Sequence, residues 1–265
     1  MSRGAFWAWV LIVAGLILLA QELGLVAVSF GALFWPSMMI LWGVHRLGRT
    51  WQPRKQLPAG PKPAATLASG DNADLHIPIE PDCYKGEIQL SPGAAHLTLQ
   101  PGRDDGNLLI GNVNTPYNRH QEQRGSTQRL HLSAKRSHPG KWDFWLHPTL
   151  PLKLKLVLGS GTTRLDLTPL TVTQLTIDRS NGRCVALLPD NGDTVIKVEG
   201  GPGDLTLISA PAAAVTINAP DSVRLKRDEA RFPGRDGFYQ SPGWNHAASQ
   251  IWIDIEAGAG TIEIR

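Results

Sequence analysis

The chain has 265 residues and a formal net charge of +3 at neutral pH, a length that allows one large domain or one domain with an anchor. Up to residue 70 there are six Lys and Arg residues and a single acid, Glu22, whereas the remainder holds 20 basic and 22 acidic residues. The positive charge therefore belongs to the N-terminal segment, and the slightly acidic remainder is not expected to bind nucleic acid.

Two apolar runs predict a membrane hairpin within residues 1–48. The first, residues 5–20, would form about 24 Å of helix, and the second, residues 23–44, is long enough to cross a bilayer core of about 30 Å. The polar Gln21 and Glu22 between the runs indicate a break between two helices. The expected anchor residues are interfacial aromatics, a helix-breaking proline and glycines that allow close helix approach: Trp7, Trp9, Gly15, Gly31, Trp35, Pro36, Trp42 and Gly43.

Two other arrangements fit the same residues. Arg3 followed by an apolar run also fits a cleaved signal peptide, although a second apolar run follows at once. Alternatively, only residues 23–44 span the bilayer and the first run lies in the membrane interface.

The flanking charges predict the orientation of the hairpin. Arg3 precedes the first run, a basic segment at residues 46–55 follows the second, and the loop between them holds only Glu22. Because positive residues remain on the cytoplasmic side, both termini are predicted to be cytoplasmic. We therefore expect a multi-pass membrane protein, with the lipid bilayer itself as one partner.

Residues 49–75 predict a linker, because they are rich in Pro and Ala, begin with basic residues and lack apolar periodicity.

The remaining residues, 76–265, predict one all-β domain. Pairs of apolar residues at alternate positions recur along it, as strands with one buried face require. The second pair of each unit falls 20 residues apart, and the first pair recurs at intervals of 19 to 21. These pairs are Leu165/Leu167, Val185/Leu187 and Leu205/Leu207, and Leu156/Leu158, Leu175/Ile177, Ile196/Val198 and Val215/Ile217; outer copies with the same internal spacing include Ile253/Ile255 with Ile262/Ile264.

Glycines lie between the paired strands, where we expect them to adopt positive φ in tight turns. These turn residues are Gly159, Gly161, Gly182, Gly200, Gly201, Gly203, Gly258 and Gly260. Two short strands cannot bury a core alone, so neighbouring units must stack. The sequence predicts a β-solenoid-like stack of two-strand rungs, and an antiparallel β-sandwich is the alternative fold.

The residues do not suggest an enzyme. The eight His residues include no HExxH or HxH motif, and the spacing of His131, His138 and His147 suits no standard metal site. The chain lacks a G-x-S-x-G nucleophile motif and a P-loop. The two cysteines, Cys83 and Cys184, allow one disulfide but do not require it. We therefore expect no catalytic residue, no metal, no cofactor and no small-molecule substrate.

A charged loop, residues 223–237, is the candidate for partner contact. Either it is an exposed connection between rungs, or it docks a partner together with the aromatic residues that follow it. Arginine next to aromatic residues is a composition that protein interfaces favour. The candidate contact residues are Arg231, Arg235, Phe238, Tyr239 and Trp244.

The order of these parts resembles a known family. The hairpin with QELGL and FWPSMMILWGV is similar to the transmembrane region of LiaF-like proteins, and residues 150–207 resemble the toastrack domain of the same group. The resemblance implies a bacterial membrane protein of the cell-envelope stress response that contacts another membrane protein, in the best-known cases a sensor histidine kinase. We expect a non-enzymatic regulator or scaffold. The alternatives are a self-assembling structural protein and an extracytoplasmic domain that binds or cleaves glycans.

Overall fold

A computed structural model of the chain describes residues 73–103, 106–256, 258 and 260–265. These residues form β-strands and loops, with one short 3-10 helix, η1 (Trp244–His246). They contain no helix that is long and apolar enough to cross a membrane. The predicted hairpin of residues 1–48 lies outside the described residues, as does the predicted linker apart from its last three residues, which begin the first strand.

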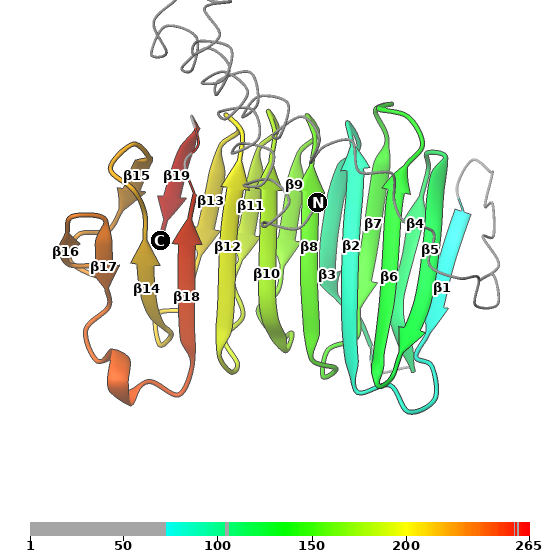
Figure 1. Cartoon of the computed structure of the whole chain (residues 1–265), viewed down its shortest axis with the longest axis horizontal. Coiled ribbons are helices and arrows are strands. Elements are labelled where there is room, and N and C mark those ends of the chain that lie inside the picture. The colour runs from blue at the N-terminus through cyan, green and yellow to red at the C-terminus, as the bar shows by residue number, and fades with distance from the viewer. Residues whose placement is uncertain (1–72, 104–105, 257, 259) are drawn as a thin grey trace, which may run out of the picture. The chain divides into compact units, whose positions relative to one another are not determined.

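The strands form two facing sheets (Figure 1). Sheet I has nine strands in the spatial order β1 (Ala73–Pro78), β4 (Asn107–Val113), β7 (Lys141–Leu146), β3 (His96–Pro101), β9 (Thr163–Asp166), β11 (Cys184–Leu187), β13 (Leu205–Ile208), β19 (Thr261–Ile264) and β15 (Arg224–Arg227). Sheet II has ten, in the order β16 (Gly234–Arg235), β17 (Phe238–Gln240), β14 (Ala214–Asn218), β18 (Gln250–Ile255), β12 (Thr194–Gly200), β10 (Val172–Arg179), β8 (Leu152–Leu158), β2 (Lys85–Gly93), β6 (Thr127–Ala134) and β5 (Tyr117–Arg124).

The repeating unit is a rung made of one strand from each sheet. In the rungs β8/β9, β10/β11 and β12/β13, the chain rises through sheet II, turns a corner and returns through sheet I (Figure 1). Neighbouring rungs pair in parallel in both sheets. The fold is therefore solenoid-like, and among the described strands antiparallel pairing occurs only towards the two ends, at β1, β4 and β5 and at β16 and β17.

Aligned rows of apolar side chains fill the space between the sheets. In sheet II one row runs through Leu154, Leu175, Ile196 and Ile253, which are directly opposite one another on adjacent strands. All four are nearly inaccessible to solvent. Each rung therefore buries its inner face between the opposite sheet and its neighbours, which is why the unit has to repeat.

The spatial order of the rungs differs from their order in the chain. The last rung, β18/β19, inserts between β12/β13 and β14/β15, so Ile253 and Ile255 belong to an internal copy. At the other end, β6/β7 lies outside β2/β3, and the chain then crosses back to form β8/β9. The C-terminal rung is thus internal, and β15 and β16, which precede it in the chain, form the edges of the two sheets at that end.

The predicted alignment of the rungs is wrong in two places. Ala186 lies opposite Leu165 and Leu207, a spacing of 21 residues in both directions. This one-residue shift turns Val185 and Leu187 to the outer face, because side chains alternate along a strand. In β8, Leu154 and Leu156, rather than Leu156 and Leu158, lie opposite Leu175 and Ile177.

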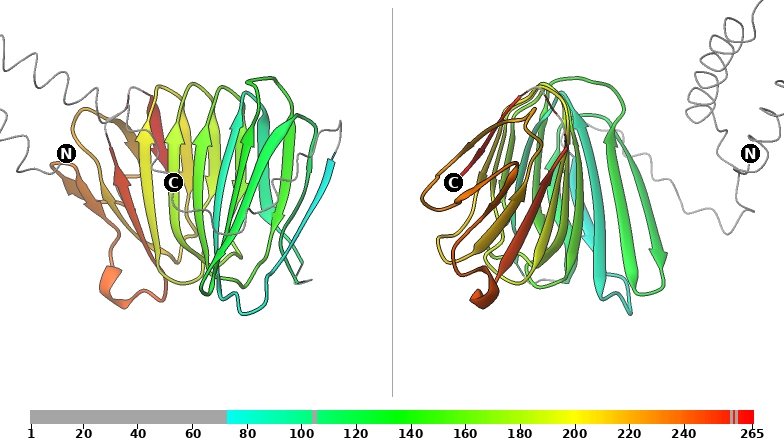
Figure 2. Two further views of the ribbon diagram at one scale, coloured as in Figure 1. Left: turned by 45° about the vertical axis from the view of Figure 1, so that its right-hand side comes forward. Right: turned by 60° about the vertical axis from the view of Figure 1, so that its left-hand side comes forward.

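Close approach between rungs is what requires most of the corner glycines, and the predicted reason, positive φ, is wrong for seven of the eight. Gly200 has φ +85°, as predicted, whereas the other seven have no positive φ. A Cβ on Gly182 would overlap the carbonyl oxygen of Gly161, and one on Gly203 would overlap that of Gly182. Stacked backbone corners therefore leave no room for a side chain, and the sheets converge at this edge (Figure 2).

Candidate functional site

The predicted contact residues gather at one end of the stack, beyond the last parallel rung. There β17 pairs antiparallel with β14, and β16 pairs antiparallel with β17. The helical turn η1 and its flanking loop follow β17 and lead back to β18. We call this end, residues 223–252, the distal cap, because β1 lies at the opposite end of sheet I.

Arg231 fastens the loop of the distal cap to the sandwich. Its guanidinium donates hydrogen bonds to the backbone carbonyls of Ser209, at 3.3 Å, and Ala210. The same group lies 5.0 Å from the ring centre of Phe232, which is completely buried. Because two of its donors are bonded to backbone carbonyls of the sandwich, Arg231 stabilises the cap and is less suited to direct contact with a partner.

Tyr239 is half-buried and packs under a cation. The guanidinium of Arg227 lies 4.1 Å from the centre of the Tyr239 ring and also donates a 2.9 Å hydrogen bond to the carbonyl of Phe232. Tyr239 thus joins β17 to β15, across the end of the two sheets.

Trp244 covers the outer face of sheet II and is itself only 8% exposed. Its ring meets that of Trp252 edge to face, with ring centres 5.0 Å apart. Near it, the Gln240 amide donates a 3.1 Å hydrogen bond to Thr216, an outward-facing residue that is fully buried. The helical turn therefore closes over the strand surface, and Trp244 supports this cover from within.

The exposed apolar side chains of this region lie on the outer face of sheet II, two of them on adjacent strands. Phe238 is 48% exposed, Trp252 is 47% exposed and Val195 is 47% exposed. Trp252 is directly opposite Val195, and Phe238 is two strands further along. We call these three residues the distal patch. Beside it lies the fully exposed Arg235, 3.7 Å from the carboxylate of Asp236.

Sequence reasoning found Phe238 and Arg235 but missed Trp252 and Val195. The signal was present, because Trp252 lies between the core residues Ile251 and Ile253 and must therefore point outward. An outward-facing Trp in a strand is unusual for a solvated surface. An open recess of about 530 Å³ next to the patch is lined by Pro233, Gln240, Ser241, Pro242, Trp244 and His246, among others.

A buried polar group lies inside the corner region, away from the distal patch. Arg179 is 5% exposed, and its guanidinium donates hydrogen bonds to the carbonyls of Gly203, at 2.8 Å, and Gly200, at 3.4 Å. Within the described residues, its Nε has no acceptor. Burial lowers the pKa of Arg179, and burial raises the pKa of the neighbouring Cys184 thiol to about 12.

The two cysteines are both free thiols. Cys184 is buried, and Cys83 is partly exposed, with its Sγ 3.2 Å from the carbonyl of Lys85. Among the described residues there is no group of three or more His, Cys, Asp or Glu that could hold a metal ion. The arrangement offers a rigid display of surface side chains.

The predicted anchor residues lie outside the described residues, so their placement stays a prediction. They are Trp7, Trp9, Gly15, Gly31, Trp35, Pro36, Trp42 and Gly43.

Comparison with solved structures identifies the same architecture elsewhere. A crystal structure of a candidate cell adhesion protein from Clostridium sporogenes ATCC 15579 matches with a TM-score of 0.62 and 20% identity, covering 73% of this chain and 97% of that one. A candidate adhesin from Bacteroides fragilis NCTC 9343 matches with a TM-score of 0.23 and 11% identity, covering 73% and 96%. The first likeness concerns the fold alone, and the second carries no weight.

Comparison with known sequences gives one family. No curated protein matches the sequence significantly. Residues 68–208, more than half of the chain, match the profile described as the N-terminal domain of toast_rack, DUF2154. This segment includes the rungs from β2/β3 to β12/β13, which form the regular part of the stack. The chain therefore belongs to the toast_rack family.

Proposed function

We propose that the protein is a non-enzymatic, membrane-anchored regulator or scaffold of the bacterial cell envelope that acts by contacting another membrane protein. The N-terminal hairpin would hold it in the inner membrane with both termini in the cytoplasm. Anchoring raises the local concentration around a partner in the same membrane, so that a small contact surface suffices. The resemblance to LiaF-like proteins makes a sensor kinase the first partner to test.

The observation that carries this proposal is the distal patch. Trp252 and Val195 lie directly opposite each other on adjacent strands, and Phe238 is exposed two strands away on the same face, with Arg235 opposite it. Exposed aromatics with a neighbouring arginine are typical of protein contact surfaces. The patch lies at the end of the stack away from β1, the strand that the N-terminal segment leads into.

The test is a regulatory assay with matched tryptophan variants. A strain lacking the protein carries either the native chain, Trp252→Ala or Trp145→Ala, and an envelope-stress reporter is measured at equal membrane levels. Trp145 is the control because it is 38% exposed on the outer face of sheet I. We expect Trp252→Ala to lose the regulatory effect and Trp145→Ala to keep it. An unchanged response in the Trp252 variant contradicts a role for the patch.

A second candidate function is glycan binding outside the cytoplasm. A solved protein that shares this fold is described as a candidate cell adhesion protein, and that likeness concerns the fold alone. Glycan binding requires the β domain to lie on the outer side of the membrane, which is the reverse of the predicted orientation. Self-assembly is a third candidate, since β1, β5 and β15 are edge strands that pair on one side only.

A further inference from the structure

A recess of about 390 Å³ lies on the outer face of sheet II, at the end opposite the distal cap. It extends over β5, β6, β2, β8 and β10, and its walls are mostly long polar side chains. We call it the proximal groove, because β1 lies at the same end of the stack. Its chemistry is carried by two parallel rows of side chains that cross the strands.

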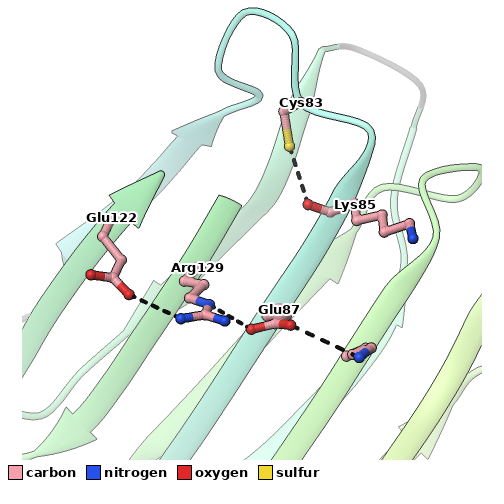
Figure 3. A network of polar contacts seen from close by, with 6 residues as sticks. Cys83, Lys85, Glu87, Glu122 and Arg129 are labelled. Carbon is pink, nitrogen blue, oxygen red and sulfur yellow. Dashed lines mark hydrogen bonds and ion pairs between the residues drawn. The ribbon is translucent and has the colours of Figure 1, made fainter. Parts of the chain in front are cut away.

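The first row alternates in charge and largely neutralises itself (Figure 3). Glu122 lies opposite Arg129, which lies opposite Glu87, which in turn lies opposite Lys153. The Arg129 guanidinium lies 2.6 Å from Glu87 and 3.4 Å from Glu122, whereas Lys153 is 4.0 Å from Glu87. The charge of Glu87, followed by hydrogen bonds to Glu122 and Glu87, raises the pKa of Arg129. Both acids are thus held mainly by Arg129, and Lys153 is only weakly paired.

The second row contains no acid. His120 lies opposite His131, His131 opposite Gln89, and Gln89 opposite Lys155. On the far side of Lys155 comes Thr176. Lys155 is exposed, and within the described residues no carboxylate lies in ion-pair range of its ammonium. The groove therefore combines a net positive charge with amide, hydroxyl and imidazole groups that can donate hydrogen bonds.

The net charge on the outer face of sheet II differs between the two ends of the stack. The proximal groove is lined by Arg129, Lys153 and Lys155 against two acids. Towards the distal end, the outer face carries Glu199 and Asp254, and the nearby Lys197 is paired with Glu256 at 3.8 Å. The basic end is also the end where β1, and hence the tether from the N-terminal segment, joins the stack. An anionic surface close to the tether would therefore attract this end of the domain.

We propose that the proximal groove binds the phosphate of anionic lipid headgroups, and so docks the β domain on the membrane that anchors it. Lys153 and Lys155 contact the phosphate, and Gln89 and Thr176 donate hydrogen bonds to its oxygens. Lys and Arg are the residues that bind phosphate through charge-assisted hydrogen bonds. The proposal rests on membrane anchoring in the proposed function, because the residues between the second apolar run and β1 set how far the domain can reach. The 28 residues from 45 to 72 span at most about 90 Å when extended, which is ample for the groove to meet the bilayer surface.

The test measures the protection of individual lysines in the full-length chain. The chain is reconstituted in nanodiscs of phosphatidylcholine alone or of phosphatidylcholine mixed with phosphatidylglycerol, and its amines are labelled and quantified by mass spectrometry. We expect anionic lipid to reduce labelling of Lys153 and Lys155 at least about threefold at low salt, and high salt to restore it. Lys226, exposed on the outer face of β15, is the internal control and should not change.

A matched pair of variants links the protection to the groove. Lys155→Glu should abolish the protection of Lys153 by anionic lipid, whereas Lys226→Glu should leave it intact. Both side chains are exposed, so circular dichroism should show an unchanged fold in each variant. Equal labelling of Lys153 and Lys155 in the two lipid mixtures overturns the proposal.

Two further experiments distinguish an anionic lipid from a soluble phosphate and from an acidic glycan as the ligand of the groove. Inorganic phosphate or polygalacturonate is added to the chain in phosphatidylcholine discs. Protection by millimolar phosphate to the same extent as by phosphatidylglycerol identifies a soluble phosphate as the ligand, and protection by polygalacturonate alone identifies an acidic glycan. Either result overturns the lipid proposal.

Membrane anchoring by the N-terminal segment is tested separately, by measuring whether the chain remains bound to the nanodiscs after washing. If it does not, pelleting the chain with phosphatidylglycerol vesicles still tests the groove. Lysine protection in that pellet supports the groove while the anchor fails, and its absence overturns both.

Discussion

The ring of Trp252 stands edge-on to the ring of Trp244, with centres 5.0 Å apart and planes at 88°, on the outer face of sheet II. Trp244 is 8% exposed and Trp252 is 47% exposed. The two tryptophans are therefore expected to respond differently to removal. Trp244 belongs to the packed cover of β14 and β18, whereas Trp252 presents much of its ring to solvent.

Trp244→Ala should destabilise the domain by about 3 kcal/mol or more, because a buried aromatic ring leaves a cavity. Trp252→Ala should cost about 1 kcal/mol, since half of its ring is already solvated and only one edge-to-face contact is lost. Urea unfolding of the two variants measures the difference. Equal losses would mean that the Trp252 ring is as buried as the Trp244 ring, and that the distal patch is not a free surface.

Gly182→Ala should destabilise the stack by more than about 2 kcal/mol, because its Cβ would overlap the Gly161 carbonyl of the neighbouring rung. Gly192→Ala is the matched control. Gly192 has φ +74° and open space around it, so the cost there should be about 1 kcal/mol of backbone strain. Thermal unfolding of both variants compares the two effects. A smaller loss for Gly182→Ala than for Gly192→Ala would refute close stacking as the reason for the corner glycines.

Cys184 should make the domain less stable in alkali. Burial raises the pKa of its thiol to about 12. The unfolded chain releases the thiol proton above a pKa of about 8.5, so between that pH and about 12 the unfolded state is favoured progressively. The contribution of Cys184 is fully present below pH ~8.5 and should fall by up to about 2 kcal/mol by pH 10.

The variant Cys184→Ala isolates this effect from other alkaline titrations. Its free energy of unfolding should fall less between pH 8 and pH 10 than that of the native chain. Parallel pH profiles for the two proteins would contradict a buried, protonated thiol. In the folded native chain, iodoacetamide should modify the partly exposed Cys83 and spare Cys184.

Arg179→Ala should cost about 2–3 kcal/mol, because the carbonyls of Gly200 and Gly203 lose charge-assisted donors inside the corner. Arg179→Met keeps most of the packing volume and removes a desolvated charge, so it should recover much of that loss. Urea midpoints of the two variants provide the comparison. If the Met variant is as unstable as the Ala variant, hydrogen bonds to the corner outweigh the cost of burying the charge.

Particular residues show how far the sequence leads to this fold. The alternating pairs Leu175/Ile177 and Leu205/Leu207 are sufficient to predict rungs with one buried face, because strand periodicity is local. The insertion of β18/β19 between earlier rungs is not local. Nothing in Ile253 or Ile262 distinguishes an internal neighbour from a terminal one, since any rung offers a similar inner face.

The errors in register have the same origin. A pattern-based alignment prefers Val185 and Leu187 in the core, because they are larger apolar residues than Cys184 and Ala186. Pairing with Leu165 and Leu207 decides otherwise, and only the neighbouring rungs carry that information. The burial of Arg179 could not be predicted for a related reason, since a charged residue at a strand end is ordinarily solvated.

The candidate site was partly predictable. The composition of residues 223–244 located the distal cap. Which of its residues stabilise the cap and which are exposed depends on contacts that composition does not show. Arg231 and Trp244 hold the cap together, and Phe238 with the unforeseen Trp252 forms its exposed surface. The proximal groove could not be predicted from the sequence, because Lys155 and His131 line the same recess only through the parallel pairing of distant strands.

The location of the C terminus tests the proposed account most directly. Arg265 follows β19 and keeps a largely exposed side chain, so a reporter can be fused after it through a flexible spacer. Paired fusions are made to one reporter that is active only in the cytoplasm and to another that is active only outside it. The account predicts activity of the cytoplasmic reporter alone. Activity of the external reporter alone would contradict the hairpin and the inner-face regulator, and would make binding of envelope glycans the leading function.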